Sequence, residues 1–420
     1  MSVPPIPTFE AESPLFWLFV IGLATILVSD FTFIPLAIIH DRLQILYEEV
    51  RDRPLVTVIV PAYNEERTIG SLLATLVDQS YENLEILVVN DGSTDNTVDA
   101  VRGYLHDTRV QLIDLPKPNT GKASAINAGI AVANGQIVIT MDADGLVEHN
   151  AVMRIVAAMQ NPMVSAVAGN VKVANRVNLL TRLQALEYIR DINIPRRAFD
   201  LMDTSIVIPG PLAAFRTRDL RAVGNYDPDT IAEDFDITIK MHKAKTGAQL
   251  EVRNVTDATC YTEAPENLHD LVMQRQRWYG GMTQSIIKHS DWKFFVKSGT
   301  YSAAAVPYIY LTLFVVPMLE LVMSGLSVVL AVLTGVVWYI LAFIIYTTLE
   351  SLTSLLALRL DNEDESLVAY SPAFVLGYRQ LLDLIRLYSF YVLMKGSLSW
   401  TRAERYGGTQ EKVKSALRSN

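Results

Sequence analysis

The chain has 420 residues, half of them hydrophobic, and a formal net charge of −9. This acidic balance, without a basic stripe, argues against a nucleic-acid-binding protein. The single cysteine, Cys260, excludes an internal disulfide and a thiolate metal cluster. The length suffices for a catalytic domain and a further segment, and the apolar residues gather near the N-terminus and after residue 300.

The first apolar stretch, residues 14–39, contains a single charge, Asp30. Its length matches the roughly 20 residues needed to cross a bilayer, so we predict a transmembrane helix. No Lys or Arg precedes it, unlike a secretory signal, whereas arginines follow from Arg42. The positive-inside rule then places residues 1–13 outside the cell and residues 40–283 in the cytoplasm. The alternative is a buried core helix.

From residue 55 apolar strands alternate with amphipathic helices, which predicts a parallel sheet with right-handed crossovers. The predicted strands are residues 55–60, 84–89, 110–115 and 137–141, and the predicted helices include 68–79 and 123–133.

Polar side chains follow the strand ends: Asn64 and Glu65, then Asp91, then Asp142 and Asp144. The carboxyl ends of such strands are where open α/β sheets bind ligands, so these residues predict a nucleotide pocket. Two carboxylates one residue apart can share a magnesium or manganese ion and leave its other sites open for phosphate oxygens. The alternative for this Asp-Ala-Asp is a surface turn.

Lys122 follows Gly121 at the start of a predicted helix. From there its ammonium group could reach a phosphate, and it could equally be a solvated surface residue.

The segment Val-Thr-Val-Ile-Val-Pro-Ala-Tyr-Asn-Glu-Glu at residues 56–66, followed by Asn-Asp-Gly-Ser-Thr-Asp at 90–95 and by Asp-Ala-Asp at 142–144, resembles glycosyltransferase family 2. Ala232-Glu233-Asp234 resembles the Thr-Glu-Asp motif of that family, and residues 274–278, Gln-Arg-Gln-Arg-Trp, match its Gln-x-x-Arg-Trp motif. This last motif is typical of the membrane-embedded, mostly processive branch, which includes cellulose, chitin, hyaluronan and poly-N-acetylglucosamine synthases.

The resemblance covers residues 55 to about 290. It implies an α/β, nucleotide-sugar-binding glycosyltransferase A-type fold with a parallel-dominated sheet, plus transmembrane and interfacial helices. Asp144 would be the direct metal ligand, supported by Asp142, and Asp91 would contact the uridine. The other substrate-binding residues would be Asn64, Glu65, Lys122, Glu233, Gln274, Arg277 and Trp278. An alternative for the Arg-x-Arg-Trp segment is an anchor at the membrane surface.

Asp234 is the predicted general base. It precedes a predicted helix over residues 235–243, and the helix dipole favours an ionised acid in a first turn. The alternative is a plain helix cap. Ala232 stands where the family most often has Thr, which puts only a peripheral hydrogen bond in doubt. Because a metal-bound diphosphate is already a good leaving group, one base suffices for displacement with inversion.

Two further stretches are assigned to the acceptor by resemblance. Residues 208–216 resemble the loop that these synthases place under the acceptor sugar, although their glycine and prolines alone indicate only a tight turn. Residues 169–188 resemble poly-N-acetylglucosamine synthases more than cellulose synthases, and the predicted donor, UDP-N-acetylglucosamine, rests mainly on them.

The last part of the chain predicts an interfacial amphipathic helix at 284–299, membrane helices at 300–396 and a basic cytoplasmic tail at 397–420. Residues 300–348 suit two spans with a turn near Met323–Gly325. A cytoplasmic tail needs an even number of C-terminal spans, so either the charged stretch after residue 366 lies in the interface or residues 325–358 hide a further span. The charges in that stretch, Arg379, Asp383 and Arg386, indicate either a polar conduit or an interfacial helix with snorkelling side chains.

Together these observations predict a multi-pass plasma-membrane enzyme, inverting and dependent on Mg²⁺ or Mn²⁺. It would extend a growing β-linked polysaccharide from a UDP-sugar and pass it through the bilayer. The sequence neither requires nor excludes a small membrane partner subunit. Alternatives are a non-processive transferase acting on a lipid, a non-catalytic nucleotide-sugar-binding subunit of an export complex, and a pure channel or carrier.

Overall fold

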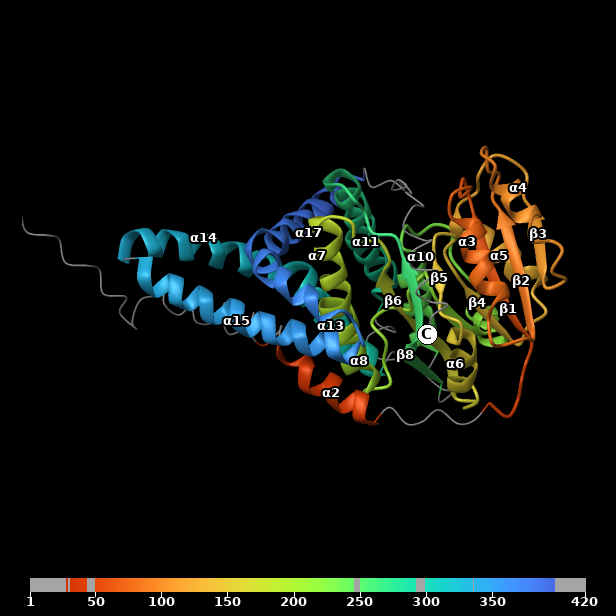
Figure 1. The fold of residues 1–420 in the computed structure, drawn as a ribbon, viewed down its shortest axis with the longest axis horizontal. Coiled ribbons are helices and arrows are strands. Elements are labelled where there is room, and N and C mark those ends of the chain that lie inside the picture. Colours follow the sequence, from red (N-terminus) through yellow and green to blue (C-terminus); the bar gives the residue numbers. More distant parts are fainter. Residues whose placement is uncertain are drawn as a thin grey trace, which may run out of the picture.

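The computed structural model describes residues 28, 31–43, 50–244, 250–291, 299–334 and 336–396. The predicted segment 1–13, most of the predicted span 14–39 and the basic tail 397–420 lie outside these residues. The described chain forms an α/β body from which two long helices, α14 (Val316–Thr334) and α15 (Val336–Leu360), project together (Figure 1).

Within the described residues eight strands form one sheet, in the order β3-β2-β1-β4-β7-β6-β8-β5. Their bounds are β1 Val56–Ala62, β2 Leu84–Asn90, β3 Val110–Asp114, β4 Ile137–Thr140, β5 Leu146–Val147, β6 Val164–Val173, β7 Ala213–Arg216 and β8 Glu251–Thr262. The first four strands in this order are mutually parallel, as predicted. The other half mixes both directions, because β7 runs antiparallel to β4 and β6 while β8 runs parallel to β6 and antiparallel to β5. The sheet is therefore mixed.

The central strands are apolar on both faces because helices cover both sides. Val58 and Val60 of β1 pack in a core formed with α3 (Ile69–Val77), α4 (Thr97–Arg102) and α6 (Ala151–Ala158). Ile59 points to the opposite face, as strand alternation requires, and packs with α5 (Lys122–Val132), α9 (Thr217–Ala222) and α10 (Glu233–Ala244). Each central strand is fixed from two sides, which holds its outgoing loop in place.

The register of the parallel strands brings the predicted site loops together. Ala62 at the end of β1 pairs with Asn90 at the end of β2, and Ile59 pairs with Thr140 at the end of β4. The loops that carry Glu65, Asp91 and Asp142 therefore leave the sheet side by side.

A second group of helices packs beside the sheet. Its members are α2 (Phe33–Leu43), α7 (Leu179–Glu187), α8 (Ile194–Asp200), α11 (Leu268–His289), α13 (Val306–Tyr310), α16 (Ser371–Ala373) and α17 (Arg379–Met394), with helical turns at Tyr188–Asn193, Tyr301–Ala305, Leu311–Val315, Glu365–Tyr370 and Phe374–Tyr378. Helix α11 runs through residue 284 without a break, so the predicted start of an interfacial helix there is not an element boundary. Residues 292–298 of that prediction lie outside the described residues.

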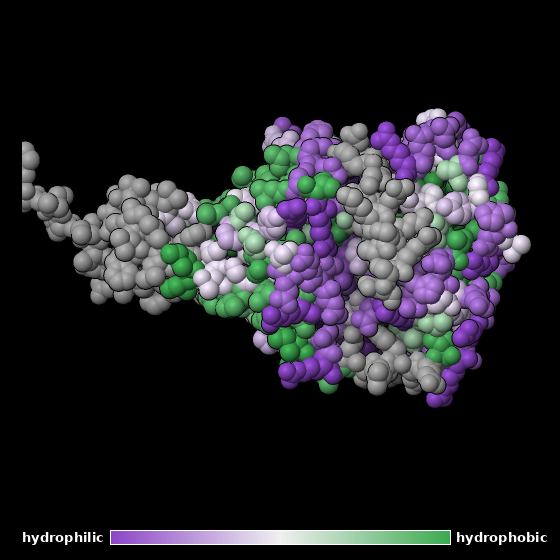
Figure 2. All heavy atoms as spheres, viewed as in Figure 1, coloured by the Kyte–Doolittle hydropathy of each residue, from purple (hydrophilic) through white to green (hydrophobic). Residues whose placement is uncertain are grey.

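By length and composition, the helical stretch Tyr301–Ser327 is apolar enough to cross a membrane, and it alone passes this test in the described part of the chain. The predicted turn near Met323–Gly325 is wrong, because α14 continues through it to Thr334. None of these residues breaks a helix strongly, so the chain turns only before α15. Figure 2 shows apolar side chains gathered where these helices leave the body, and polar ones over the sheet domain.

Candidate active site

A cavity of about 760 Å³ lies at the carboxyl edge of the parallel strands and extends toward the helical half of the molecule. It is lined by ten of the predicted site residues: Glu65, Asp91, Lys122, Asp142, Asp144, Glu233, Asp234, Gln274, Arg277 and Trp278. These side chains come from the loops after β1, β2 and β4 and from the helices α5, α10 and α11. The fold thus brings together residues that span more than half of the sequence.

Lys122 is the electrostatic centre of the site. Its Nζ atom lies 2.6 Å from Oδ1 of Asp142 and 2.7 Å from Oε1 of Glu233, and its side chain is only 24% exposed. Burial lowers the pKa of Lys122, but the charges of Asp142, Glu233 and Asp234 raise it by more, so the pKa lies well above its ordinary value. The solvated-surface alternative for Lys122 is wrong, since its ammonium group joins two acidic motifs.

Asp234 occupies the first turn of α10, as predicted. Its Oδ2 atom accepts a 3.2 Å hydrogen bond from the amide of Gly210, and its Oδ1 accepts one from its neighbour Phe235. A Cβ atom on Gly210 would lie 2.8 Å from Nζ of Lys122 and 3.6 Å from Oδ2 of both Asp142 and Asp234. Residue 210 must therefore be small for the three charged groups to meet, which explains this glycine in the 208–216 loop.

Burial and, after it, the charge of Glu233 raise the pKa of Asp234, the charge of Lys122 opposes them, and the net pKa is about 6. A carboxyl with this pKa is mostly ionised at neutral pH and accepts a proton more readily than an ordinary aspartate. These are the properties that a general base requires.

Asp144 and Asp142 fit a divalent metal ion. Asp144 is almost fully buried yet lines the cavity, and its Oδ2 accepts a hydrogen bond from the hydroxyl of Thr262 at 3.1 Å. Carboxylate oxygens beside open space suit Mg²⁺ or Mn²⁺, which keep water and phosphate ligands. In the described chain no group of three acids, histidines or cysteines could hold a metal on its own, so such an ion would take its other ligands from substrate and water.

Asp91 and Glu65 line the cavity but already bind the protein. The carboxylate of Asp91 accepts hydrogen bonds from the amides of Thr120 and Gly121 at 2.8–3.1 Å, and so fixes the loop that leads into Lys122. Glu65 accepts a hydrogen bond from Thr68 at 2.7 Å.

Asn64 is not among the residues that line the cavity. Its side chain accepts a hydrogen bond from the amide of Thr94 at 2.7 Å, and its backbone adopts a positive φ of 55°. Asn64 therefore shapes the loop that follows β2. The pattern of polar residues at strand ends could not separate this role from substrate contact.

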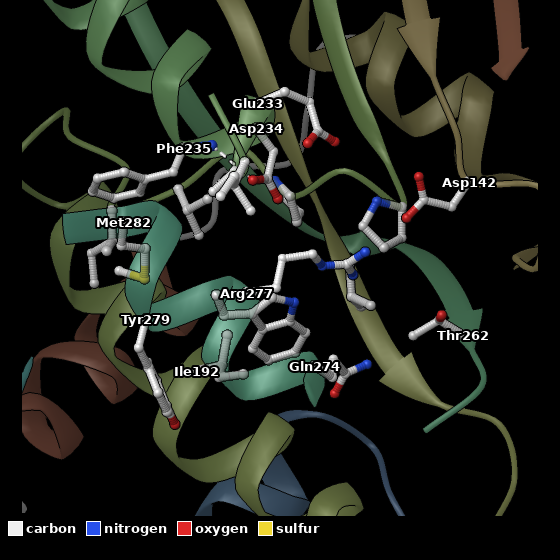
Figure 3. Close-up of a pocket in the computed structure, with 18 of the residues that line it drawn as sticks. Asp142, Ile192, Glu233, Asp234, Phe235, Thr262, Gln274, Arg277, Tyr279 and Met282 are labelled. Atoms are coloured by element: carbon white, nitrogen blue, oxygen red, sulfur yellow. Dashed lines mark hydrogen bonds between the residues drawn. The ribbon is translucent and has the colours of Figure 1, made fainter. Parts of the chain in front are cut away.

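Helix α11 supplies the remaining wall (Figure 3). The side chains of Gln274 and Arg277 reach into the cavity from this helix, and Arg277 extends toward the space beside Asp142 and Asp234. Trp278 lines the same cavity. These three residues lie within two turns of one helix, so their spacing in the sequence already carried the signal.

Arg275, one of two arginines in the Gln-Arg-Gln-Arg-Trp segment, has a role that the sequence did not reveal. It is fully buried, its guanidinium lies 2.8 Å from Glu187, and it stacks on Trp278 with 4.1 Å between the guanidinium carbon and the ring centroid. Glu187 also accepts a hydrogen bond from Tyr378, the residue directly before α17. Arg275 therefore supports Trp278 from behind. Residues two apart on a helix point in different directions, which could have distinguished Arg275 from Arg277.

The far end of the cavity reaches the helices after residue 300, where Glu320, Thr353, Arg379 and Arg386 line it. Arg379 lies 3.5 Å from Glu320 and 3.3 Å from Glu350, and its side chain is 8% exposed. Asp383 is buried beside Arg386, at 2.8 Å. These charges face inward, so the snorkelling alternative for them is wrong.

Residues 57–224 match the family model Glycosyl transferase family 2. This match covers less than half of the chain, and it agrees with the resemblance to glycosyltransferase family 2 that the motifs indicated. The matched region contains nearly all of the four parallel strands together with Asp142 and Asp144, and Glu233 and Asp234 follow it, whereas the cavity also takes residues from α11 and from the helices after residue 300.

The chain is similar to poly-β-1,6-N-acetyl-D-glucosamine synthases. It is 29% identical to one from Staphylococcus epidermidis over 249 residues, which make up 59% of each chain. It is 31% identical to one from Staphylococcus aureus strain COL over 234 residues, 56% of each chain. The chain thus matches a little over half the length of these curated relatives.

Among solved structures, a mannosyltransferase from Pyrobaculum calidifontis, in complex with GDP-Man and Mn²⁺, aligns with a TM-score of 0.63 at 21% identity. The alignment covers 90% of this chain and 99% of that one. At this identity the likeness shows a shared fold, and it confirms the predicted α/β glycosyltransferase A-type architecture.

Proposed function

We propose that this protein is an inverting glycosyltransferase that transfers N-acetylglucosamine from UDP-N-acetylglucosamine to the end of a β-linked polysaccharide. The observation that carries the proposal is the meeting of Lys122, Asp142, Glu233 and Asp234 at one wall of a cavity that also contains Arg277 and Trp278. The choice of N-acetylglucosamine is supported by the similarity to poly-β-1,6-N-acetyl-D-glucosamine synthases.

In this mechanism Asp234 takes the proton from the acceptor hydroxyl. The oxygen forms a bond to the anomeric carbon as the bond from that carbon to the diphosphate breaks, so an α-linked donor gives a β-linked product. Lys122 and Arg277 place positive charge where the diphosphate departs. Asp142 and Asp144 would hold Mg²⁺ or Mn²⁺, which supplies further positive charge to the leaving group when bound.

Trp278 would stack on the apolar face of the acceptor sugar. Its indole is held by Arg275, which in turn is held by the buried Glu187. Such a chain of contacts keeps an aromatic platform in one orientation, as positioning of an acceptor hydroxyl beside a base requires.

The polymer would leave through the helical half of the protein, and the protein would lie in the plasma membrane with its sheet domain in the cytoplasm. Two observations support this. The stretch Tyr301–Ser327 is long and apolar enough to span a bilayer, and polar groups such as Glu320 and Arg379 line the same cavity as Asp234. Polar side chains at membrane depth are costly unless they serve a polar path or partner.

The test is to incubate the purified full chain in lipid vesicles with a panel of labelled nucleotide sugars and Mg²⁺ or Mn²⁺. The proposal predicts incorporation from UDP-N-acetylglucosamine into a ladder or polymer, lost when the metal is chelated. If only a single sugar is added to lipid, the protein is a non-processive transferase and not a polymerase. The absence of incorporation from every donor would contradict the proposal.

A further inference from the structure

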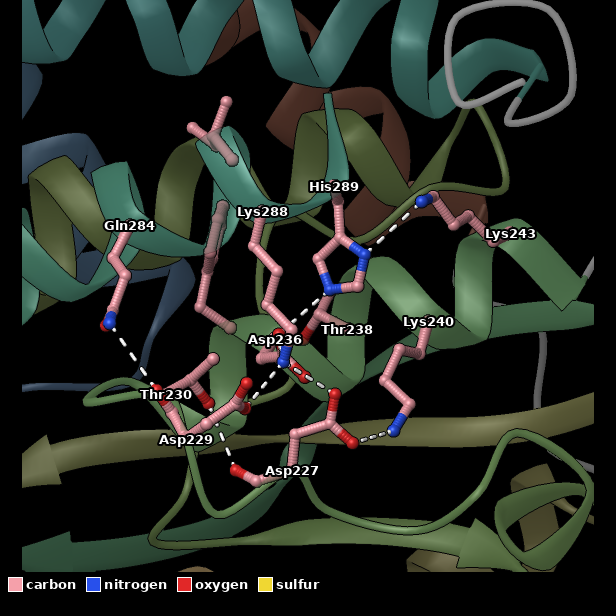
Figure 4. Close-up of polar contacts among 12 residues, drawn as sticks. Asp227, Asp229, Thr230, Asp236, Thr238, Lys240, Lys243, Gln284, Lys288 and His289 are labelled. Carbon is pink, nitrogen blue, oxygen red and sulfur yellow. Dashed lines mark hydrogen bonds and ion pairs between the residues drawn. The ribbon is translucent and has the colours of Figure 1, made fainter. Parts of the chain in front are cut away.

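A cluster of charged residues behind the active site ties α10 to α11 (Figure 4). Nζ of Lys288, near the end of α11, lies 2.6 Å from Asp227, 2.7 Å from Asp229 and 3.4 Å from Asp236. One ammonium group thus joins three carboxylates from the segment that leads into and begins α10.

The segment held in this way forms part of the active-site wall. We call residues 227–232 the 227–232 loop, and residues 228–232 of it line the cavity. The loop runs directly into Glu233 and Asp234. Any shift of the loop therefore moves the proposed base.

Helix α11 contacts the loop along one face. A Cβ atom on Gly281 would lie 2.6 Å from Cβ of Ala232, so the helix and the loop approach as closely as a glycine allows. One turn on, Gln284 accepts a hydrogen bond from the amide of Ile231 at 3.1 Å. Lys288 follows one turn later. Positions 281, 284 and 288 continue the helical spacing of 274 and 277, so they share the face that presents Gln274 and Arg277 to the cavity.

The first turn of α10 is also tied to the end of α11. Asp236 is fully buried, and its Oδ1 atom lies 2.8 Å from Nε2 of His289. Lys240, one turn further on, lies 2.5 Å from Asp227 and also donates to the carbonyl of Asn225. The ion pairs therefore close a ring between the loop, α10 and α11.

We propose that Lys288 is a positioning residue for glycosyl transfer, which holds the 227–232 loop on α11 and so sets Asp234 against Arg277 and Trp278. This proposal rests on the proposed function, because it takes Asp234 as the general base. The residue does not touch the cavity itself. Its effect passes through the loop, and a displacement of about 1 Å at a reacting group can cost about 100-fold in rate.

The experiment compares wild-type protein, Lys288→Met and Lys288→Arg in the same vesicles. The methionine keeps the length of the side chain and removes the charge, while the arginine restores it. Arg102→Met is the matched control, because Arg102 forms an exposed ion pair with Asp99 far from the cavity. We measure kcat per donor-binding site, KM for UDP-N-acetylglucosamine and amide hydrogen exchange over residues 227–236.

We expect Lys288→Met to lower kcat about tenfold or more, with KM changed less than about twofold, and to speed exchange in residues 227–236. Lys288→Arg should recover most of the rate, and Arg102→Met should match the wild type. Unchanged exchange in Lys288→Met would overturn the proposal whether or not the wild type transfers sugar. Faster exchange with unchanged kcat would also overturn it and leave the proposed function intact. If the wild type is inactive, the proposed function is refuted, and so is the role of Lys288 as a positioning residue.

Discussion

Oδ2 of Asp142 and Oδ2 of Asp234 lie at the same distance, 3.6 Å, from the position that a Cβ atom of residue 210 would occupy. The first residue follows a buried central strand and the second begins a helix 92 positions later in the sequence. Their convergence on Gly210 is what turns separate acidic motifs into one site. Lys122 completes the group by pairing with Asp142.

Gly210→Ala tests this convergence. The added Cβ would lie 2.8 Å from Nζ of Lys122, so this ammonium group must shift, which strains its ion pairs with Asp142 and Glu233. We expect transfer to fall at least about tenfold, with a loss of about 1 kcal/mol in the free energy of unfolding. The control is Gly325→Ala on α14, where an added Cβ meets nothing within 4 Å, and which should keep wild-type activity. If the two variants have equal activity, the site accommodates a Cβ atom at residue 210, which contradicts the prediction.

Lys122→Met should destabilise the protein and remove transfer. The substitution leaves Asp142 and Glu233 without their shared cation, and breaking such a partly buried pair costs about 2 kcal/mol or more. The pKa of Lys122 in the folded chain lies above its unfolded value, so its stabilising charge is fully present below an unfolded pKa of about 10.4. Lys122 also attracts Asp234, whose pKa is about 6, so the loss should be larger at pH 9, where Asp234 is ionised, than at pH 6, measured by thermal unfolding in detergent. A loss of stability at only one of the two pH values would contradict the assignment of Lys122 as the shared cation of Asp142 and Glu233.

Asp234→Asn should make the folded protein more stable at neutral pH. The pKa of Asp234 is raised from 3.8 to about 6 in the folded chain. Ionisation therefore costs stability as pH rises from about 4 to about 6, and the full cost remains above that range. We expect the variant to gain about 1 to 2 kcal/mol near pH 7.5.

The gain should vanish near about pH 3, below the unfolded pKa of 3.8, where the aspartate is mostly protonated in both states. Thermal unfolding of the wild type and Asp234→Asn across this range measures it. A stability difference that does not change with pH would mean that the substitution acts through packing and not through the charge.

Arg275 and Arg277 should differ although only one residue separates them in the sequence. Arg275→Met leaves the buried carboxylate of Glu187 without its partner, and we expect a loss of about 3 kcal/mol or more in unfolding free energy. Arg277→Met removes a side chain that lines the cavity, and we expect a smaller loss of stability than in Arg275→Met, with a large loss of transfer. Chemical unfolding and transfer assays on both variants test the contrast. Similar stability losses in both would refute it.

The parallel half of the fold was predictable because its signal is local. Runs such as residues 84–89 have the length and composition of a strand covered on both faces, and the acids directly after them mark the ligand edge. The antiparallel strands were not predicted. Strand β7, at Ala213–Arg216, is four residues long and is defined by its pairing with β4 and β6, a contact between distant segments.

The chemistry of the site divides in the same way. The resemblance of local motifs to glycosyltransferase family 2 pointed to Asp142, Asp234 and Arg277. The role of Arg275 depends on Glu187 and Tyr378, residues from two other helices, so no local pattern contains it. The inward direction of Arg379 likewise depends on Glu320 and Glu350, which lie on other helices.

The central claim is that Asp234 is the base of a transfer reaction in this cavity, and the most direct measurement separates its chemistry from donor binding. Wild type and Asp234→Asn are reconstituted side by side, UDP binding is measured by titration, and the rate of sugar transfer from UDP-N-acetylglucosamine is measured on the same samples. The account predicts unchanged UDP affinity and a rate reduced by about 100-fold or more. An Asp234→Asn variant that binds UDP and transfers sugar at the wild-type rate would contradict it.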